Sequence, residues 1–353
     1  MMLFSCRIPL PPRAITLAAA GDNLIHSSIF KDAATGGGYD FTPIFSEIKD
    51  IISSADIAYI NQETPLGEAN YSGYPRFCTP KQIGDALADA GFDVIGIANN
   101  HMLDQGDAGL KFTREYLSSV AENVVGYTED DYAIVERNGI KVGFAAFTYS
   151  TNCGGKTPIP RLNEKTVRKL LPSVRAKCDV LGVLAHFGDE FDSGRYVERF
   201  EPSERQEFFA RLFSECGADI VIGTHPHVIE RAAWIEDDGR RTLCVYSLGN
   251  LLSNMRYGSQ MLGCILRVRI IKWMGAIFVV SPELIPTVCH FSSAHTGYKI
   301  YPLAEYGDGL ALLHGTNDEN NEKPFCMETL TLYYEKNIDA EFRAEEYKRG
   351  KEK

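Results

Sequence analysis

Two histidines stand one residue apart in the segment Gly223-Thr224-His225-Pro226-His227. The proline between them restricts the backbone, and the glycine that precedes them allows a tight turn. The turn therefore presents two imidazole rings at low entropic cost, and neutral imidazole is a common metal ligand. This segment predicts a metal site.

Other residues with metal-ligand chemistry occur where predicted strands end. They are Asp22, Glu63, Asn100 with the neighbouring His101, and His186. In α/β sheets the loops at the carboxyl ends of the strands converge, and ligands bind there. Together with His225 and His227, these residues supply two carboxylates, an amide oxygen and several imidazoles, which suit manganese, iron or zinc. The sequence therefore predicts that they meet in one metal site.

Several of these residues also have a purely structural interpretation. Asp22 alone is typical of a helix N-cap, because Asp accepts the free amide hydrogens of a following helix. Glu63 fits a turn carboxylate, and His186 alone fits a hydrogen-bonded core histidine. Asn100 and His101 are different, because two successive amides and an imidazole directly after an apolar strand indicate that something binds them.

Other chemistries are less favoured. Ser247 lies in only half of a G-x-S-x-G elbow, which argues against a serine hydrolase. The glycines within residues 36–38 and 106–109 lack the lysine and the spacing of a phosphate-binding loop. Three histidines lie outside the strand-end pattern, and we expect them to be structural or exposed: His290, His295 and His314. His26 has no assigned role.

The elements that must position these residues are repeated strand-helix units. Short apolar runs alternate with amphipathic stretches from residue 14 to about residue 250. The predicted strands cover residues 15–20, 57–60, 92–98, 179–185 and 219–222. The predicted helices cover residues 43–55, 80–90, 107–121, 163–177 and 202–216. This alternation indicates an α/β fold.

Two hairpins interrupt the strand-helix pattern. Asn138-Gly139 joins predicted strands at 132–137 and 140–147, and Asp238-Gly239 precedes a return strand at 243–247. This mixture argues against a purely parallel sheet. Further strands are predicted at 262–272 and 276–285, followed by a polar loop at 317–323 and a charged, solvated helix or frayed tail at 337–353.

Composition limits the class of protein. The 353 residues, 44% hydrophobic and 24% charged, suffice for one large or two ordinary globular domains. The net charge of −11 argues against nucleic-acid binding, and it requires that any anionic substrate meet local cations or metals.

Nine cysteines without a C-x-x-C pair suggest neither a disulfide framework nor a zinc knuckle, and they fit a reducing cytoplasm. No apolar run reaches the eighteen or so residues of a membrane span. Pro9, Pro11 and Pro12 argue against a signal-peptide core. We therefore expect a cytoplasmic protein with no membrane anchor in this chain.

Taken in order, six segments resemble the CapA family of poly-γ-glutamate capsule-synthesis proteins over residues 15–252. They are Gly21-Asp22-Asn23-Leu24-Ile25-His26; Asn61-Gln62-Glu63-Thr64-Pro65; Gly91-Phe92-Asp93-Val94 leading into Ala98-Asn99-Asn100-His101, with Asp104 and Gly106; His186-Phe187-Gly188-Asp189-Glu190; Gly217-Ala218-Asp219 leading into Gly223-Thr224-His225-Pro226-His227-Val228; and Tyr246-Ser247-Leu248-Gly249-Asn250. That family looks related to the calcineurin-like metallophosphoesterases. Glu230 departs from the pattern, because glutamine is common there.

The resemblance implies a fold and a set of roles. The fold would be an α/β, four-layer metallophosphatase-like sandwich of two mixed β-sheets face to face, with helices on both outer sides. Residues 1–255 would form this core, and residues 256–353 would add C-terminal strands to the same domain and a charged tail. By resemblance, two divalent metal ions would bind, one at Asp22 and His227 and the other at Asn100, His186 and His225. Glu63 would bridge them, with His101 as an acid near the leaving group.

The function implied by the resemblance is a role in poly-γ-glutamate or capsule biosynthesis. Two metal ions would generate a metal-activated hydroxide that hydrolyses a phosphoester or a γ-glutamyl amide in an anionic small molecule or polyglutamate. One alternative is a non-catalytic accessory protein that binds an anionic polymer or partner during capsule assembly. Another is a member of the family whose metal site is structural.

Overall fold

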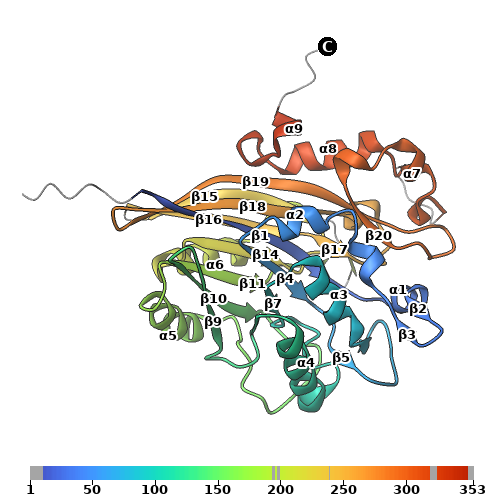
Figure 1. Cartoon of the computed structure of the whole chain (residues 1–353), viewed down its shortest axis with the longest axis horizontal. Helices are drawn as coiled ribbons and strands as arrows, with labels where there is room; N and C mark the ends of the chain where they lie inside the picture. Colours follow the sequence, from blue (N-terminus) through green and yellow to red (C-terminus); the bar gives the residue numbers. More distant parts are fainter. Residues whose placement is uncertain (1–10, 193–194, 197–198, 238, 319–323, 349–353) are drawn as a thin grey trace, which may run out of the picture.

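Two large sheets packed face to face, with helices outside them, form the molecule (Figure 1). The structure is a computed structural model that describes residues 11–192, 195–196, 199–237, 239–318 and 324–348. Both sheets are mixed, so the four-layer α/β sandwich implied by the resemblance is confirmed.

The first sheet has eight strands, in the order β20-β19-β18-β1-β4-β7-β8, with β17 also paired to β1. Their bounds are β1 (Arg13–Asn23), β4 (Ile57–Gln62), β7 (Val94–Gly96), β8 (Asn123–Val125), β17 (Asn250–Leu252), β18 (Leu262–Trp273), β19 (Ala276–His290) and β20 (Lys299–Pro302). Strands β1, β4, β7 and β8 run parallel, and β18 joins β1 in antiparallel register. Strands from beyond residue 255 therefore belong to the same sheet as β1.

The second sheet has six strands, in the order β15-β16-β14-β11-β10-β9. Their bounds are β9 (Tyr132–Arg137), β10 (Ile140–Thr148), β11 (Val180–His186), β14 (Ile220–Thr224), β15 (Ile229–Asp237) and β16 (Arg240–Leu248). The antiparallel pairs β9–β10 and β15–β16 confirm both predicted hairpins. Asp238, in the second turn, lies outside the described residues.

The carboxyl ends of the central strands meet between the two sheets. In the first sheet β1 and β4 are parallel, with Asp22 opposite Asn61. In the second sheet β11 and β14 are parallel, with His186 opposite Thr224. Because β1 also packs against β14, the residues that end these strands come together, as the strand-end pattern predicted.

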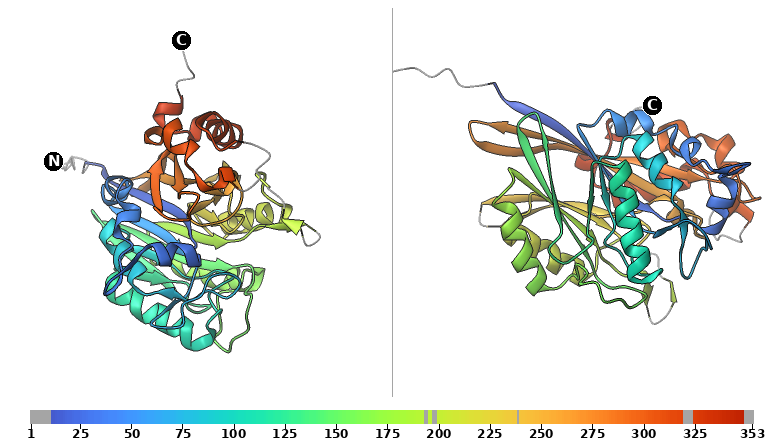
Figure 2. Two further views of the ribbon diagram at one scale, coloured as in Figure 1. Left: turned by 90° about the vertical axis from the view of Figure 1, so that its right-hand side faces the viewer. Right: turned by 60° about the horizontal axis from the view of Figure 1, so that its bottom comes forward.

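Helices cover the outer side of each sheet (Figure 2). On the first side α4 (Gly106–Val120) packs against β8, and α3 (Gln82–Ala90) packs against α4. On the other side α5 (Glu164–Arg175) packs against β10 and β11, and α6 (Glu204–Glu215) packs against β15 and β16. None of the helices in the described part of the chain combines the length and apolar character needed to cross a membrane.

Short elements complete the fold. They are α1 (Ser27–Asp32), β2 (Ala34–Thr35), β3 (Gly38–Tyr39), β5 (Leu66–Gly67), β6 (Thr79–Pro80), β12 (Phe191–Asp192), β13 (Arg195–Tyr196), η2 (Gly258–Met261), η3 (Leu303–Glu305) and α7 (Asp308–Leu312). The predicted polar loop at 317–323 begins in a 3-10 turn, η4 (Gly315–Asp318), and its residues 319–323 lie outside the described residues.

The single helix predicted over residues 43–55 is wrong. A 3-10 turn, η1 (Thr42–Phe45), is followed by the separate short helix α2 (Lys49–Ser53). Between them the Ser46 hydroxyl donates to the carbonyl oxygen of Pro43 at 3.1 Å. Such local bonds compete with the regular helical ladder. The break still lets apolar side chains on both pieces, including Phe45 and Ile52, reach the core.

The solvated tail predicted at 337–353 is also wrong for the residues described. After α8 (Met327–Asn337) the chain forms a 3-10 turn, η5 (Ala340–Phe342), and a short helix, α9 (Glu345–Lys348). Ile338, Phe342 and Ala344 are buried, and the Phe342 ring centroid lies 6.4 Å from that of Trp234 on β15. The charge pattern failed because Ile338 and Phe342 join the main apolar core and Ala344 is also buried.

We expect Phe342→Ala to lower the free energy of unfolding by about 3 kcal/mol or more, the usual effect of truncating a buried Phe. Urea denaturation followed by circular dichroism measures this change. Glu341→Ala is the control, because the neighbouring Glu341 is exposed and its loss leaves stability nearly unchanged. Equal stability of the two variants would show that the tail does not dock.

Candidate metal centre

The turn that carries the two histidines is strained. His225 has a backbone φ of 108° and His227 a φ of 58°, values that residues other than glycine rarely adopt. Each such residue costs on the order of 1–3 kcal/mol and persists only where its surroundings hold it. Asp22 supplies one restraint, because its Oδ2 accepts the backbone N–H of His225 at 3.0 Å. The chain thus holds both imidazoles in place against a local cost.

Glu63 is the most informative residue of the site. Its side chain is fully buried, and neither carboxylate oxygen has a hydrogen-bond partner among the described residues. Oε1 lies 3.7 Å from Nε2 of His186 and 3.7 Å from Nε2 of His227. Burying a carboxylate without a partner is expensive, so the arrangement fits a cation held between carboxylate and imidazoles.

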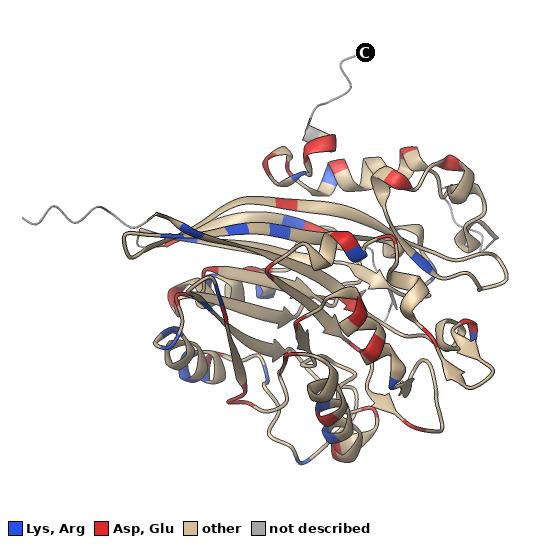
Figure 3. Ribbon diagram, viewed as in Figure 1, with Lys and Arg blue, Asp and Glu red and all other residues tan. Residues whose placement is uncertain are grey.

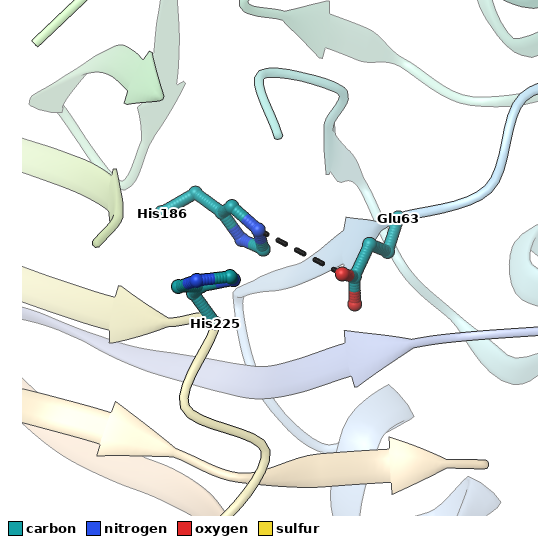
Figure 4. Close-up of side chains that lie close together, drawn as sticks. All are labelled: Glu63, His186 and His225. Atoms are coloured by element: carbon teal, nitrogen blue, oxygen red, sulfur yellow. Dashed lines mark ion pairs between the residues drawn. The ribbon is translucent and has the colours of Figure 1, made fainter. Parts of the chain in front are cut away.

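Three side chains from the ends of three different strands turn toward one point. Figure 4 shows Glu63, His186 and His225 facing one another, from the ends of β4, β11 and β14. The ring atom Nδ1 of His225 is also buried without a partner among the described residues. A buried ring nitrogen without a hydrogen-bond partner has a lone pair available to bind a metal ion.

Two groups of possible ligands share Glu63. One contains Glu63, His186 and His225, and the other contains Asp22, Glu63 and His227, each with its ligand atoms within 4.8 Å of one another. Asn100 adjoins the first group, because its Oδ1 lies 3.0 Å from Nε2 of His186. The structure therefore brings together all six residues that the sequence suggested as ligands.

One structural alternative, the helix N-cap at Asp22, does not apply, and the one for His186 applies in part. Asp22 is no helix N-cap, because its carboxylate accepts from the Asn61 amide at 2.6 Å and from the His225 backbone. The helix that follows, α1, instead has His26 at its N-cap position. His186 is held as a core histidine would be, with Nδ1 2.9 Å from the Thr224 hydroxyl, yet its Nε2 faces the carboxylate of Glu63.

His101 lies at the edge of this group. Its Nδ1 is 2.7 Å from Oδ2 of Asp104, which also accepts the backbone N–H of Phe77. The Phe77 ring packs edge-on against the imidazole, with centroids 4.7 Å apart. Asp104 and Phe77 therefore fix the orientation of the His101 ring. His26 contacts the same Phe77 ring, at 5.4 Å.

The three remaining histidines are outside this centre, as the sequence suggested. His290 and His314 are buried, and their ring centroids lie 5.4 Å apart among aromatic side chains. His295 stacks on Phe291 with centroids 5.2 Å apart. None of the three joins a candidate ligand group in the part of the chain that the structure describes.

Sequence reasoning missed Glu190. Its Oε1 lies 2.8 Å from Nε2 of His227, and its Oε2 lies 3.9 Å from Nε2 of His225. These three residues form a third group of possible ligands. The available signal was a second carboxylate four residues after His186, in a segment already noted for its family resemblance.

Charges in the site depend on one another. Burial raises the pKa of Glu63, and the nearby Asp22 carboxylate raises it further. Burial lowers the pKa of His225 to about 4. Burial also opposes protonation of His227, but Glu63 and Glu190 outweigh it and raise that pKa. In return, the two imidazoles outweigh burial at Glu190 and lower its pKa to about 2. This donor set fits a divalent cation.

Glu230 is a second unusual carboxylate, three residues after His227 on β15. It is buried, and its Oε2 accepts from the Gln206 amide at 2.6 Å. Burial raises its pKa to about 8; the Gln206 hydrogen bond opposes this shift, and Asp189 adds to it. In the unfolded chain the same carboxyl ionises near 4.5. Its burial therefore destabilises the fold increasingly as pH rises from 4.5 to 8.

Known proteins are similar to this chain in sequence. The sequence model of the family described as bacterial capsule synthesis protein PGA_cap matches residues 16–255. The capsule biosynthesis protein CapA of Bacillus anthracis is 27% identical over 258 residues, covering 67% of this chain and 59% of that protein. The PGA biosynthesis protein CapA of Bacillus subtilis is 29% identical over 224 residues, covering 59% and 56%. The chain thus spans less than two thirds of the length of these relatives.

A solved structure is also similar. The calcineurin-like phosphoesterase YfkN from Bacillus subtilis superimposes with a TM-score of 0.46 at 16% sequence identity. The superposition covers 93% of this chain and 97% of that one.

We expect Glu190→Gln to lower the pKa of His227 in the metal-free protein, because the Glu190 carboxylate favours the charged imidazole. Titration of the histidine resonances by NMR in the presence of a chelator measures the shift. Asp189→Asn is the matched control, since that neighbouring carboxylate is 46% exposed and makes no contact with His227 among the described residues. An unchanged His227 titration in Glu190→Gln would contradict the coupling.

Glu230→Gln is expected to raise the free energy of unfolding by about 2–3 kcal/mol at pH 7 and by less than about 1 kcal/mol at pH 5. The neutral amide has no proton to lose, and it still accepts from Gln206. Urea denaturation at both pH values, with a chelator present, measures the difference. Glu236→Gln on the same strand, where the side chain is 80% exposed, should change neither value. A gain that does not depend on pH would refute the assignment.

Proposed function

This chain belongs to the family of bacterial capsule synthesis proteins described as PGA_cap, which confirms the resemblance, and from that premise we propose a metal-dependent hydrolase. The proposed substrate bond is a phosphoester or a γ-glutamyl amide. One observation carries the proposal: the carboxylate of Glu63 is fully buried, unpartnered among the described residues, and flanked by the imidazoles of His186 and His227.

The proposed ligands divide into two sets. Asp22 and His227 would hold one divalent ion, and Asn100, His186 and His225 would hold the other, with Glu63 between them. Bound divalent ions supply Lewis-acid activation of water and neutralise charge that develops on a phosphoryl or carbonyl oxygen. Manganese, iron and zinc all suit this mixture of nitrogen and oxygen ligands. Glu190 lies beside the first of these sets, with its Oε1 2.8 Å from Nε2 of His227.

His101 is the proposed general acid. Oδ2 of Asp104 accepts a hydrogen bond from the Nδ1–H of His101, so the ring keeps one orientation. Nε2 of His101 is then the atom that can carry a proton to a leaving oxygen or nitrogen. Phe77, packed against the ring, limits its rotation. Asp104 is then a positioning residue, because it acts only through the imidazole.

The proposed substrate is anionic. The relatives carry names that refer to capsule and PGA biosynthesis, and a γ-glutamyl polymer is rich in carboxylates. With a net charge of −11, this chain repels such a molecule except where local positive charge opposes the repulsion. Cations held at the carboxyl ends of the strands would supply that charge next to the bond to be cut.

A reducing compartment such as the cytoplasm is the proposed location. The eight cysteines within the described residues are all free thiols. Buried thiols such as Cys244 and Cys264 have a pKa raised by burial, which keeps them as unreactive thiols. These cysteines fill core space and stabilise the fold without forming cross-links.

We expect Glu63→Gln to lose bound metal and to hydrolyse substrate more than about 100-fold more slowly, since even loss of an outer partner of a ligand commonly costs about 10- to 100-fold. Elemental analysis of the purified protein, run with assays on a generic phosphodiester and on γ-glutamyl peptides, measures both effects. Glu68→Gln is the control, because Glu68 lies five residues away with its side chain 63% exposed.

Two outcomes would overturn the proposal. Glu63→Gln with the metal content of the unaltered protein would refute the ligand set. Stable metal in the unaltered protein with no turnover on either class of substrate would refute the hydrolase. The latter result would favour an accessory protein that binds an anionic polymer, and direct measurement of polyglutamate binding would then decide.

A further inference from the structure

The hairpin of β18 and β19 ends in a cluster of exposed apolar side chains. Trp273 is 45% exposed, Met274 76% and Phe278 45%. The strands are among the longest of the fold, and their tip lies at the end of the molecule where β1 begins, since Arg13 pairs with Lys272 (Figure 1). The metal centre lies at the other end of β1.

One face of this hairpin is uncovered near its tip. Side chains alternate along β18, where Val268 and Ile270 are buried while Arg267 and Arg269 are exposed. The exposed face continues to Trp273. On β19, Phe278 stands opposite Ile271 and Val280 opposite Arg269, so they share that face. The face therefore joins an apolar tip to two arginines behind it.

Two exposed arginines on β18, Arg267 and Arg269, bring positive charge to this face. Arg267 and Arg269 form no ion pair with any described residue, although Glu283 on β19 stands opposite Arg267 and the chain carries a net charge of −11. Lys272, which faces the other way, is engaged with Asp179 at 2.7 Å. Figure 3 shows the basic positions along β18 in blue. The exposed face thus combines apolar and positive groups.

We propose that the tip of the β18–β19 hairpin, through Trp273, Met274 and Phe278, docks onto a lipid surface that carries negative charge. Trp, with its apolar ring and polar N–H, favours the boundary between water and hydrocarbon. The arginines behind the tip attract anionic headgroups. Apolar side chains and nearby cations on one projecting element are the usual composition of an interfacial anchor.

The shape of the tip favours lipid over another protein. Specific protein interfaces bury about 800 Å² on each partner, and a two-stranded tip offers a narrow contact. A second copy of this chain would also bring another net charge of −11. Residues 276–283 of β19 have no further strand beside them in the described structure. Shallow insertion leaves their backbone groups hydrated, whereas deep burial in hydrocarbon would not.

Vesicle sedimentation tests the proposal directly. The full chain should bind vesicles containing phosphatidylglycerol and bind weakly to vesicles of phosphatidylcholine alone, and salt should reduce the binding. The chain has two tryptophans, so in the Trp234→Phe background Trp273 is the sole reporter. Its fluorescence should shift to shorter wavelength when anionic vesicles are added.

Variants separate the two contributions. Replacing Trp273, Met274 and Phe278 with Ser should abolish binding and Arg267→Gln with Arg269→Gln should weaken it roughly 10- to 30-fold. Leu312→Ser with Leu313→Ser is the matched control, because those leucines are more exposed than Trp273 but lie elsewhere. Circular dichroism confirms that each variant folds.

Three results would overturn the proposal. They are equal binding to neutral and anionic vesicles, binding unaffected by the tip variants, or self-association of the chain that the tip variants abolish. The last would assign the face to a second copy. Because metal content and hydrolysis in free solution do not involve the tip, failure here leaves the proposed hydrolase untouched.

Discussion

The central constraint on this molecule is the burial of Glu63 among imidazoles, between two sheets. A carboxylate taken out of water must be compensated, and no hydrogen-bond donor among the described residues does so. Its surroundings instead provide the rings of His186 and His227 at 3.7 Å. In the metal-free fold a proton on His227 compensates part of the negative charge of this buried carboxylate. A divalent cation would compensate it more fully.

That balance also links the two sheets mechanically. Asp22 ends a strand of the first sheet, yet its carboxylate holds the backbone of His225, which follows a strand of the second. The strained turn at His225 and His227 can exist only while the sheets remain packed. At Gly223, a residue of β14 two positions before His225, a Cβ atom would lie 1.9 Å from the Tyr246 carbonyl oxygen on β16, so only glycine allows the two strands to pack this closely. The geometry of the site thus depends on the packing of the two sheets.

The sequence was informative where a residue's position follows from periodicity. The change from apolar to polar residues marks where strands end, so it places Asp22, His186 and His225 at the carboxyl ends of their strands. That these ends meet depends on the packing of β1 in the first sheet against β14 in the second. Glu190 could not be placed in this way, because it lies in an irregular loop whose path depends on packing. The helix at 43–55 and the tail at 337–353 failed for a related reason: the contacts of Ser46 and Phe342 override local pattern.

Strand β1 runs between the two proposed functional regions, the metal centre and the tip of the β18–β19 hairpin. Its amino end, at Arg13, pairs with Lys272 near the hairpin tip, and its carboxyl end carries Asp22. At about 3.3 Å per residue, a strand of this length separates its ends by roughly 30 Å. A tip resting on lipid would therefore leave the metal centre away from the headgroups. Anionic lipid and an anionic substrate would not compete for the same surface. The lipid would meet the arginines of β18, and the substrate would meet the proposed metal ions.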